Sequence, residues 1–141
     1  MSTSETKRFE IVIPSKLDRI ESVEKLSERA ADVMQFSDDE KDSLAIAVTE
    51  AVNNAIIHGN KRDASKKVFI NFKFEGKKLI VIVKDEGQGF DPNDLRDPLD
   101  PQNLLKESGR GIFILKALMD EVNFEFEKGG TVIKMAKEKK S

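Results

Sequence analysis

The twelve residues from Thr49 to Asn60 constrain the fold most, because they combine an apolar helix face with polar side chains. Apolar residues recur there at helical spacing and predict a largely buried helix; they are Val48, Ala51, Val52, Ala55 and Ile56. Glu50 and Asn54 stand four residues apart and therefore project from one side of that helix. Burying a carboxylate or a carboxamide costs free energy unless the group is paired. We therefore expect both groups to be paired within the protein or to face a polar ligand.

Length and composition limit the class of protein. The 141 residues suffice for one domain over 1–141, with its core expected at about 9–136. A net charge of −2 argues against direct binding of nucleic acid, and the absence of cysteine excludes disulfides and thiolate metal sites. No apolar run is long enough to span a bilayer, and the N-terminus lacks the apolar core of a signal peptide. We therefore expect a cytoplasmic protein that does not use a membrane as a partner.

Two elements are predicted before the central helix. A short apolar run at 9–13, stopped by Pro14, predicts an edge strand. Residues 16–36 carry apolar side chains every three or four positions and predict an amphipathic helix. The charged face of this helix, which includes Arg19, is either solvated or a surface for a partner protein.

The central helix has start and stop signals. Ser37 and Glu40 fit a capping box, in which each side chain accepts a hydrogen bond from the other residue's backbone N–H. The helix is predicted to run from there to about Ile57, with Gly59 at its C-cap.

The remaining chain predicts two hairpins, separated by a long loop and one more helix. Their ranges are strands at 68–74 and 79–83, a loop at 90–108, a helix at 109–120, and strands at 122–127 and 131–136. This order of elements predicts an α/β two-layer sandwich, in which helices cover one face of a mixed, mainly antiparallel sheet.

Two glycine-containing segments favour a ligand at the central helix. Asp85 directly follows the predicted central strand, where a carboxylate can accept a hydrogen bond from an exocyclic amine such as that of adenine. Gly87 and Gly89 allow the backbone to turn and to approach a flat ligand closely. An ordinary strand-to-loop turn would explain the same pattern.

The second glycine segment opens the last predicted helix. Gly109, Arg110 and Gly111 stand where free N–H groups and the helix dipole favour an anion. Arg110 and the nearby Lys106 can add contacts to a phosphate, although the pattern is not that of a P-loop. The alternative is a flexible helix start with Arg110 in solvent.

Together, the three segments resemble the N, G1 and G2 boxes of the ATPase superfamily shared by gyrase, histidine kinases, the mismatch-repair ATPase and the heat-shock chaperone. Its fold, the Bergerat fold, is an α/β sandwich of the kind expected here. From Phe9 to Ala136, the chain is most similar to small anti-sigma factors that are also serine/threonine protein kinases. Thr-Glu-Ala-Val-Asn-Asn-Ala-Ile-Ile-His-Gly resembles their N box, Asp-Glu-Gly-Gln-Gly-Phe their G1 box, and Ser-Gly-Arg-Gly-Ile-Phe-Ile-Leu their G2 box.

The resemblance implies ATP or ADP and Mg²⁺ as cofactors. It makes Glu50 the general base, Asn54 the Mg²⁺ ligand and Asp85 the residue that binds adenine. The glycines would shape the pocket around adenine and phosphates; they are Gly87, Gly89, Gly109 and Gly111. The partners implied are a sigma factor, an anti-anti-sigma antagonist of the STAS type as phosphorylation substrate, and a second copy of the chain.

Some assignments stay open. Asn53 adjoins Asn54, so the metal ligand depends on helix register, although the spacing from Glu50 favours Asn54. His58 most simply forms a hydrogen bond at the helix end. The γ-phosphate contact is open among the basic residues near the glycines: Arg96, Lys106 and Arg110.

Two rival functions are compatible with the same motifs. One is a nucleotide-gated binding module that sequesters a partner without significant kinase activity. The other is the ATP-binding half of a histidine kinase, separated from its phosphoacceptor.

Overall fold

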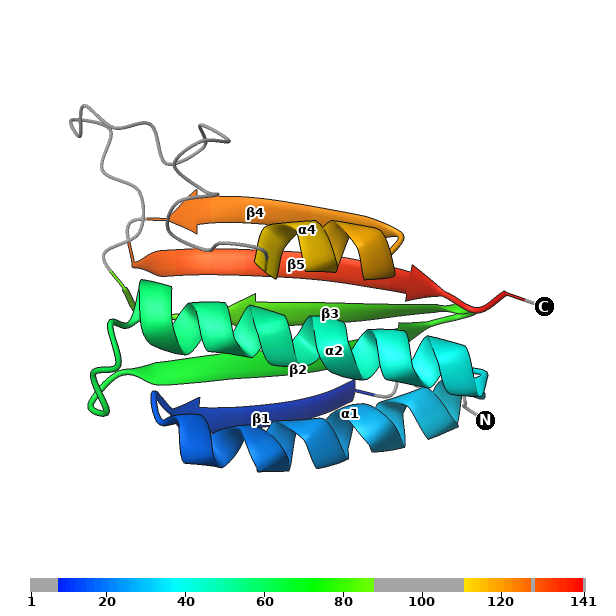
Figure 1. Cartoon of the computed structure of the whole chain (residues 1–141), viewed down its shortest axis with the longest axis horizontal. Coiled ribbons are helices and arrows are strands. Elements are labelled where there is room, and N and C mark those ends of the chain that lie inside the picture. Colours follow the sequence, from blue (N-terminus) through cyan, green and yellow to red (C-terminus); the bar gives the residue numbers. More distant parts are fainter. Residues whose placement is uncertain (1–7, 88–110, 128, 141) are drawn as a thin grey trace.

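Five strands form one sheet in the order β1-β2-β3-β5-β4. The computed structural model describes residues 8–87, 111–127 and 129–140 (Figure 1). The strands are β1 (Arg8–Pro14), β2 (Lys67–Glu75), β3 (Lys78–Lys84), β4 (Glu121–Glu127) and β5 (Gly130–Glu138). Every ladder between the described strands is antiparallel, so the mixed character expected from the sequence is not seen among them. The predicted edge strand is β1, and the continuous apolar run forms the central strand β3.

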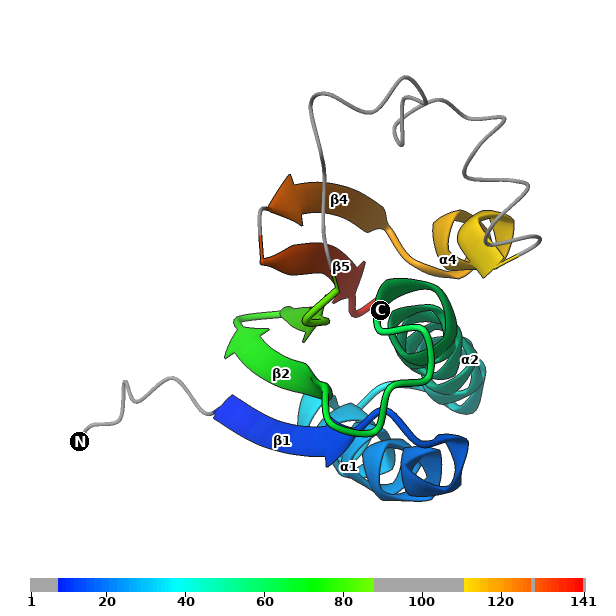
Figure 2. The same cartoon turned by 90° about the vertical axis from the view of Figure 1, so that its left-hand side faces the viewer.

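The α-helices of the described ranges all lie on the same face of this sheet (Figure 2). They are α1 (Ile20–Met34), α2 (Asp38–Asn54) and α4 (Gly111–Leu118). The hydrophobic core fills the space between the two layers, where α2 contributes Ala51 and Val52 and β3 contributes Val81, all fully buried. The predicted two-layer α/β sandwich is therefore confirmed. None of the helices in the described ranges is long and apolar enough to cross a membrane.

The helix predicted at 16–36 is divided in the structure. A short 3-10 turn at Leu17–Arg19 precedes α1, and Gln35 ends α1 with a left-handed φ of 58°. The predicted capping box at the start of α2 is confirmed. The Ser37 N–H donates to Glu40 Oε1 over 2.8 Å, and the Glu40 N–H donates to Ser37 Oγ over 3.2 Å.

Glu40 also connects α2 to the C-terminal end of the chain. Its second oxygen, Oε2, accepts a hydrogen bond from the backbone N–H of Lys140 over 2.8 Å. The backbone hydrogen bonds from Ser37 and Lys140 lower the pKa of this nearly buried carboxyl. One side chain therefore caps a helix and holds the segment that follows β5.

Glu40→Ala should lower the free energy of unfolding by about 1–2 kcal/mol, because it removes the capping box and leaves the Lys140 N–H without its partner. Urea unfolding at pH 7 measures the loss. Since the folded pKa of Glu40 is lowered, the contribution is present above the ordinary glutamate pKa of 4.5 and is lost as the pH falls through the lower folded value. Asp39→Ala, an exposed change in the same helical turn, is the matched control. Equal losses in both variants would contradict this role of Glu40.

Candidate functional site

The described parts of the three predicted boxes meet at one end of the sandwich. Figures 1 and 2 show that the C-terminal end of α2, the C-terminal end of β3 and the N-terminal end of α4 lie together there. Segments far apart in sequence thus face one region, as the motif comparison predicts.

At this end, α2 continues into one wide π-helical turn, Ala55–Gly59. The N–H of Asn60 donates to the carbonyl of Ala55 over 2.8 Å, which closes the wider ring. The expected C-cap at Gly59 is wrong. Gly59 lies inside the π turn, and the left-handed backbone comes later, at Lys61 and Arg62, with φ of 54° and 60°.

Gly59 is required for a different reason: it lies against the carboxylate of Asp85. A Cβ atom at position 59 would lie 1.9 Å from Asp85 Oδ2. Gly87 and Gly130 are equally close-packed. A Cβ atom on Gly87 would lie 2.2 Å from the Gly59 carbonyl oxygen, and one on Gly130 would lie 2.0 Å from the Asp85 carbonyl oxygen. Three glycines from three segments thus enclose Asp85. In the sequence, Gly129-Gly130 marks only the turn between the two predicted strands at 122–127 and 131–136.

Asp85 itself is held as a buried carboxylate, 4% exposed, at the end of β3. Oδ1 accepts the backbone N–H groups of Gly87 over 3.0 Å and of Thr131 over 2.9 Å. Burial raises the pKa of Asp85, while these two hydrogen bonds oppose the rise. Both described hydrogen bonds use Oδ1, whereas Oδ2 is the oxygen that lies against Gly59.

Asn60 organises the surrounding chain, although the motif analysis gave it no role. This side chain is fully buried. Its Nδ2 donates to Ser15 Oγ over 2.7 Å and to the Lys67 carbonyl over 3.0 Å, and its Oδ1 accepts from the Glu86 N–H over 2.8 Å. Asn60 therefore fixes the residue after Asp85 to the end of β1 and the start of β2. An asparagine directly after His-Gly was the only signal for it.

Glu50 and Asn54 lie on α2 one turn apart, as predicted, and both side chains are half-buried. Asn53 and His58 are half-buried as well. The Nδ2 atom of Asn54 is buried and has no hydrogen-bond partner among the described residues. An unsatisfied buried amide is costly, so Asn54 fits a site where a polar ligand supplies the missing contact.

Several predicted residues cannot be placed. Gly89, Lys106, Gly109 and Arg110 lie outside the described residues, as does the whole predicted loop at 90–108, which includes Arg96. Gly111 is the first residue of α4, so the third box does open a helix.

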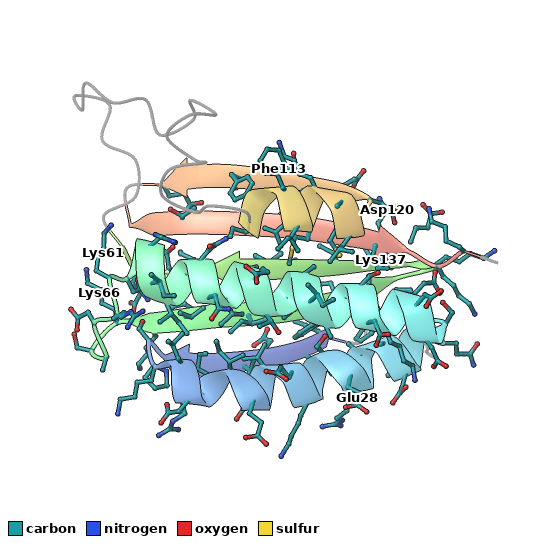
Figure 3. The ribbon with its side chains drawn as sticks, in the orientation of Figure 1. Glu28, Lys61, Lys66, Phe113, Asp120 and Lys137 are labelled. Carbon is teal, nitrogen blue, oxygen red and sulfur yellow. The ribbon has the colours of Figure 1, made fainter. Side chains whose placement is uncertain are left out.

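Positive charge is available from the loop between α2 and β2. Figure 3 shows Lys61 and Lys66 on the segment that follows α2, at the same end of the molecule as the site. Lys66 is close enough to Asp85 to lower the pKa of that carboxyl, although its effect is smaller than that of burial. The end of the sandwich thus combines a buried carboxylate, close-packed backbone and basic side chains.

A two-layer sandwich with a buried carboxylate behind glycines, beside a helix end bearing polar side chains, is the arrangement that the resemblance to the ATPase superfamily predicts. Comparison with known proteins agrees. The family model described as the histidine kinase-like ATPase domain matches residues 13–137. The chain therefore belongs to the histidine kinase-like ATPase family.

Curated relatives and solved structures refine this placement. Serine-protein kinase RsbW from Bacillus licheniformis and from Bacillus subtilis are each 33% identical over 130 residues, which is 88% of this chain and 81% of each relative. The RsbU and RsbW domains of a Mycobacterium tuberculosis protein superpose with a TM-score of 0.70 at 17% identity, covering 94% of this chain and 32% of that one. The Acinetobacter baumannii histidine kinase AdeS superposes with a TM-score of 0.53 at 14% identity, covering 94% and 68%. These two structures support the fold.

Gly59→Ala should lower the free energy of unfolding by about 1–3 kcal/mol, because the new methyl group occupies the place of Asp85 Oδ2. Thermal or urea unfolding measures this. Gly129→Ala is the control, since nothing lies within 4 Å of a Cβ there. The double variant with Gly59→Ala and Asp85→Ala should lose less free energy of unfolding than the two single variants lose together. Strict additivity would show that the two residues do not press on each other.

Proposed function

We propose that this protein is an ATP- and Mg²⁺-dependent serine/threonine protein kinase that also acts as an anti-sigma factor. The observation that carries the proposal is the Asp85 carboxylate, buried at the end of β3 and enclosed by Gly59, Gly87 and Gly130. Such a carboxylate suits the exocyclic amine of adenine, and the close-packed glycines suit a flat base. Membership of an ATPase-domain family and the RsbW relatives support the same conclusion.

The phosphate end of the nucleotide is assigned to α2 and to the start of α4. Asn54 would hold Mg²⁺ through its side-chain oxygen, which suits a hard cation. In the proposed complex, water and phosphate oxygens would complete the shell. When bound, Mg²⁺ neutralises phosphate charge. Gly89, Lys106, Gly109, Arg110 and Gly111 complete the proposed site.

Glu50 is the proposed catalytic base. It lies one turn before Asn54 on the same side of α2. In the proposed mechanism its carboxylate accepts the proton of a substrate hydroxyl near the γ-phosphate. The hydroxyl oxygen bonds to the γ-phosphorus while the bond to the leaving ADP oxygen breaks. Positioning and charge neutralisation supply most of the catalysis in phosphoryl transfer, so these few groups suffice.

The proposed partners follow from the serine-protein kinase relatives and the resemblance to anti-sigma kinases. The phosphorylated substrate would be a serine or threonine of an anti-anti-sigma protein of the STAS type. Unphosphorylated antagonist displaces the sigma factor, and phosphorylation releases the antagonist and leaves sigma bound. We also propose a cytoplasmic location and self-association into a homodimer.

Asp85→Asn should abolish ATP binding without lowering stability at pH 7. The raised pKa means that folding makes the ionised carboxylate less favourable, so removing the charge does not cost folding free energy. The free energy of unfolding of the variant should rise relative to that of the wild type as the pH increases above the ordinary aspartate pKa of 3.8 and through the raised folded pKa. Titration calorimetry with ATP and ADP, with and without Mg²⁺, gives binding, and thermal unfolding gives stability. ATP binding of wild-type strength by the variant would refute the adenine assignment.

Glu50→Ala should bind ATP with wild-type affinity and transfer phosphate to a STAS antagonist at least about 100-fold more slowly, because the base is missing. Labelled ATP and purified antagonist measure transfer. Glu121→Ala, which removes an exposed carboxylate on β4, is the matched control and should leave transfer unchanged. Full transfer by Glu50→Ala would remove Glu50 from the mechanism. No transfer by the wild type would leave a nucleotide-gated binding module instead.

A further inference from the structure

The carboxamide of Asn60 belongs to a closed ring of hydrogen bonds beside Asp85. Asn60 directly follows the π-helical turn at the end of α2. Its side-chain oxygen accepts from the backbone N–H of Glu86 over 2.8 Å, and its Nδ2 donates to the carbonyl of Lys67 over 3.0 Å. The Glu86 side chain completes the ring, because its Oε1 accepts from the backbone N–H of Lys67. The ring therefore joins the end of α2 and the start of β2 to the segment that follows β3.

Asparagine suits position 60 because its short side chain carries both a donor and an acceptor. The amide nitrogen faces two acceptors, Ser15 Oγ and the Lys67 carbonyl, whereas the amide oxygen faces the N–H of Glu86. Turning the carboxamide over would place oxygen against the carbonyl and N–H against N–H, so the partners fix its orientation. The side chain is fully buried, and removing it would leave buried partners unsatisfied.

Glu86 links this ring to the buried carboxylate. The two N–H groups that follow Asp85 in the chain are both held by side-chain oxygens. The N–H of Glu86 donates to Asn60, and the N–H of Gly87 donates to Asp85 Oδ1 over 3.0 Å. Two successive peptide groups after β3 are thus fixed. A shift of residue 86 would also move the Gly87 N–H, which is one of the two described donors to Asp85.

A neighbouring residue, Ser15, separates a role in stability from a role in binding. Ser15 is 3% exposed and belongs to the same buried polar cluster as Asn60. The hydrogen bonds described for it join the nitrogen of Asn60 and, over 2.8 Å, the carbonyl of Lys66. Both side chains therefore stabilise this corner of the sandwich, whereas the one that holds the N–H of Glu86 is Asn60.

We propose that Asn60 is a positioning residue for nucleotide binding. It holds the segment after β3 in its binding conformation before a nucleotide arrives, so that binding does not have to order this segment. The inference rests on the proposed function, in which Asp85 accepts a hydrogen bond from the exocyclic amine of adenine. Asn60 acts through the backbone of Glu86 and not by touching the ligand. Its effect therefore belongs to the contact with the adenine amine and not to the contacts with the phosphates.

Two nucleotides isolate this contact: ATP, and purine riboside triphosphate, which carries hydrogen in place of the exocyclic amine. The wild type should bind ATP at least about tenfold more tightly, because the amine donates to a carboxylate. Asn60→Ala should reduce this preference to about threefold or less, since forming the amine contact then requires the segment after β3 to be ordered. Titration calorimetry of the full chain, well below the unfolding temperature of each variant, measures both affinities.

Ser15→Ala is the matched control. It removes two hydrogen bonds from the same buried cluster and should lower the unfolding temperature. Its preference for ATP over purine riboside triphosphate should stay within about twofold of the wild-type value, because Asn60 still holds residue 86. An equal loss of preference in both variants would mean that the preference follows stability, and would overturn the proposal. A folded Asn60→Ala with the wild-type preference would overturn it too.

Amide hydrogen exchange of the nucleotide-free wild type tests the proposal without depending on the folding of Asn60→Ala. The Glu86 amide should exchange at least about tenfold more slowly than an unprotected amide, although Glu86 is an exposed residue. Exchange at the unprotected rate would overturn the role of Asn60 while the ATP site stands. A wild type that binds neither nucleotide, or that binds both equally, would instead refute the adenine assignment of the proposed function, and the role of Asn60 with it.

Discussion

The burial of the Asp85 carboxylate is the constraint on which the rest of the site depends. A carboxylate that is 4% exposed needs donors, and the backbone of residues 87 and 131 supplies them. Those donors belong to the segment after β3 and to β5, so both must lie close to the end of α2. Glycine at 59, 87 and 130 is the condition for that approach. Asn60 then joins the same region to the ends of β1 and β2.

The separation of roles within the sandwich follows from this arrangement. One end contains the buried carboxylate and the half-buried polar residues of α2. At the other end, Glu40 joins the start of α2 to Lys140, Lys137 Nζ donates to the Leu118 carbonyl at the end of α4, and Asp120 accepts from the Glu138 N–H. Figure 3 shows Lys137 and Asp120 on this side, away from Lys61 and Lys66. These hydrogen bonds therefore fix the ends of α2, α4 and β5 that lie away from the site, whereas Asn60 fixes the chain at the site end.

The sequence pattern was sufficient to predict the architecture, because hydrophobic periodicity and helix capping depend only on residues close together in the sequence. The capping box at Ser37 and the central position of β3 could both be predicted in this way. The true role of Gly59 could not, since it depends on a contact with Asp85, 26 positions away in sequence, that no local rule contains. The π turn and the hydrogen bonds of Asn60 were missed for the same reason. The motif comparison placed Asp85 correctly at a strand end, whereas its burial and the resulting rise in its pKa are tertiary effects.

The order of strands also has a consequence for folding kinetics. Three of the four ladders in the sheet join β1 to β2, β2 to β3, or β4 to β5, and the last two of these are hairpins of neighbouring strands. Only the β3–β5 ladder crosses the long central segment, from Lys84 opposite Val132 to Lys78 opposite Glu138. Pairing over 48 to 60 positions carries a larger loop-closure entropy than either hairpin, so this ladder is expected to form after the hairpins, as is the β1–β2 ladder, which pairs residues 53 to 65 positions apart. The hydrogen bond from the Thr131 N–H to Asp85 Oδ1 forms only when β5 pairs with β3. A chain that has formed its two hairpins separately would therefore lack the enclosed Asp85 carboxylate, and a ligand bound at that end would stabilise only the assembled sheet.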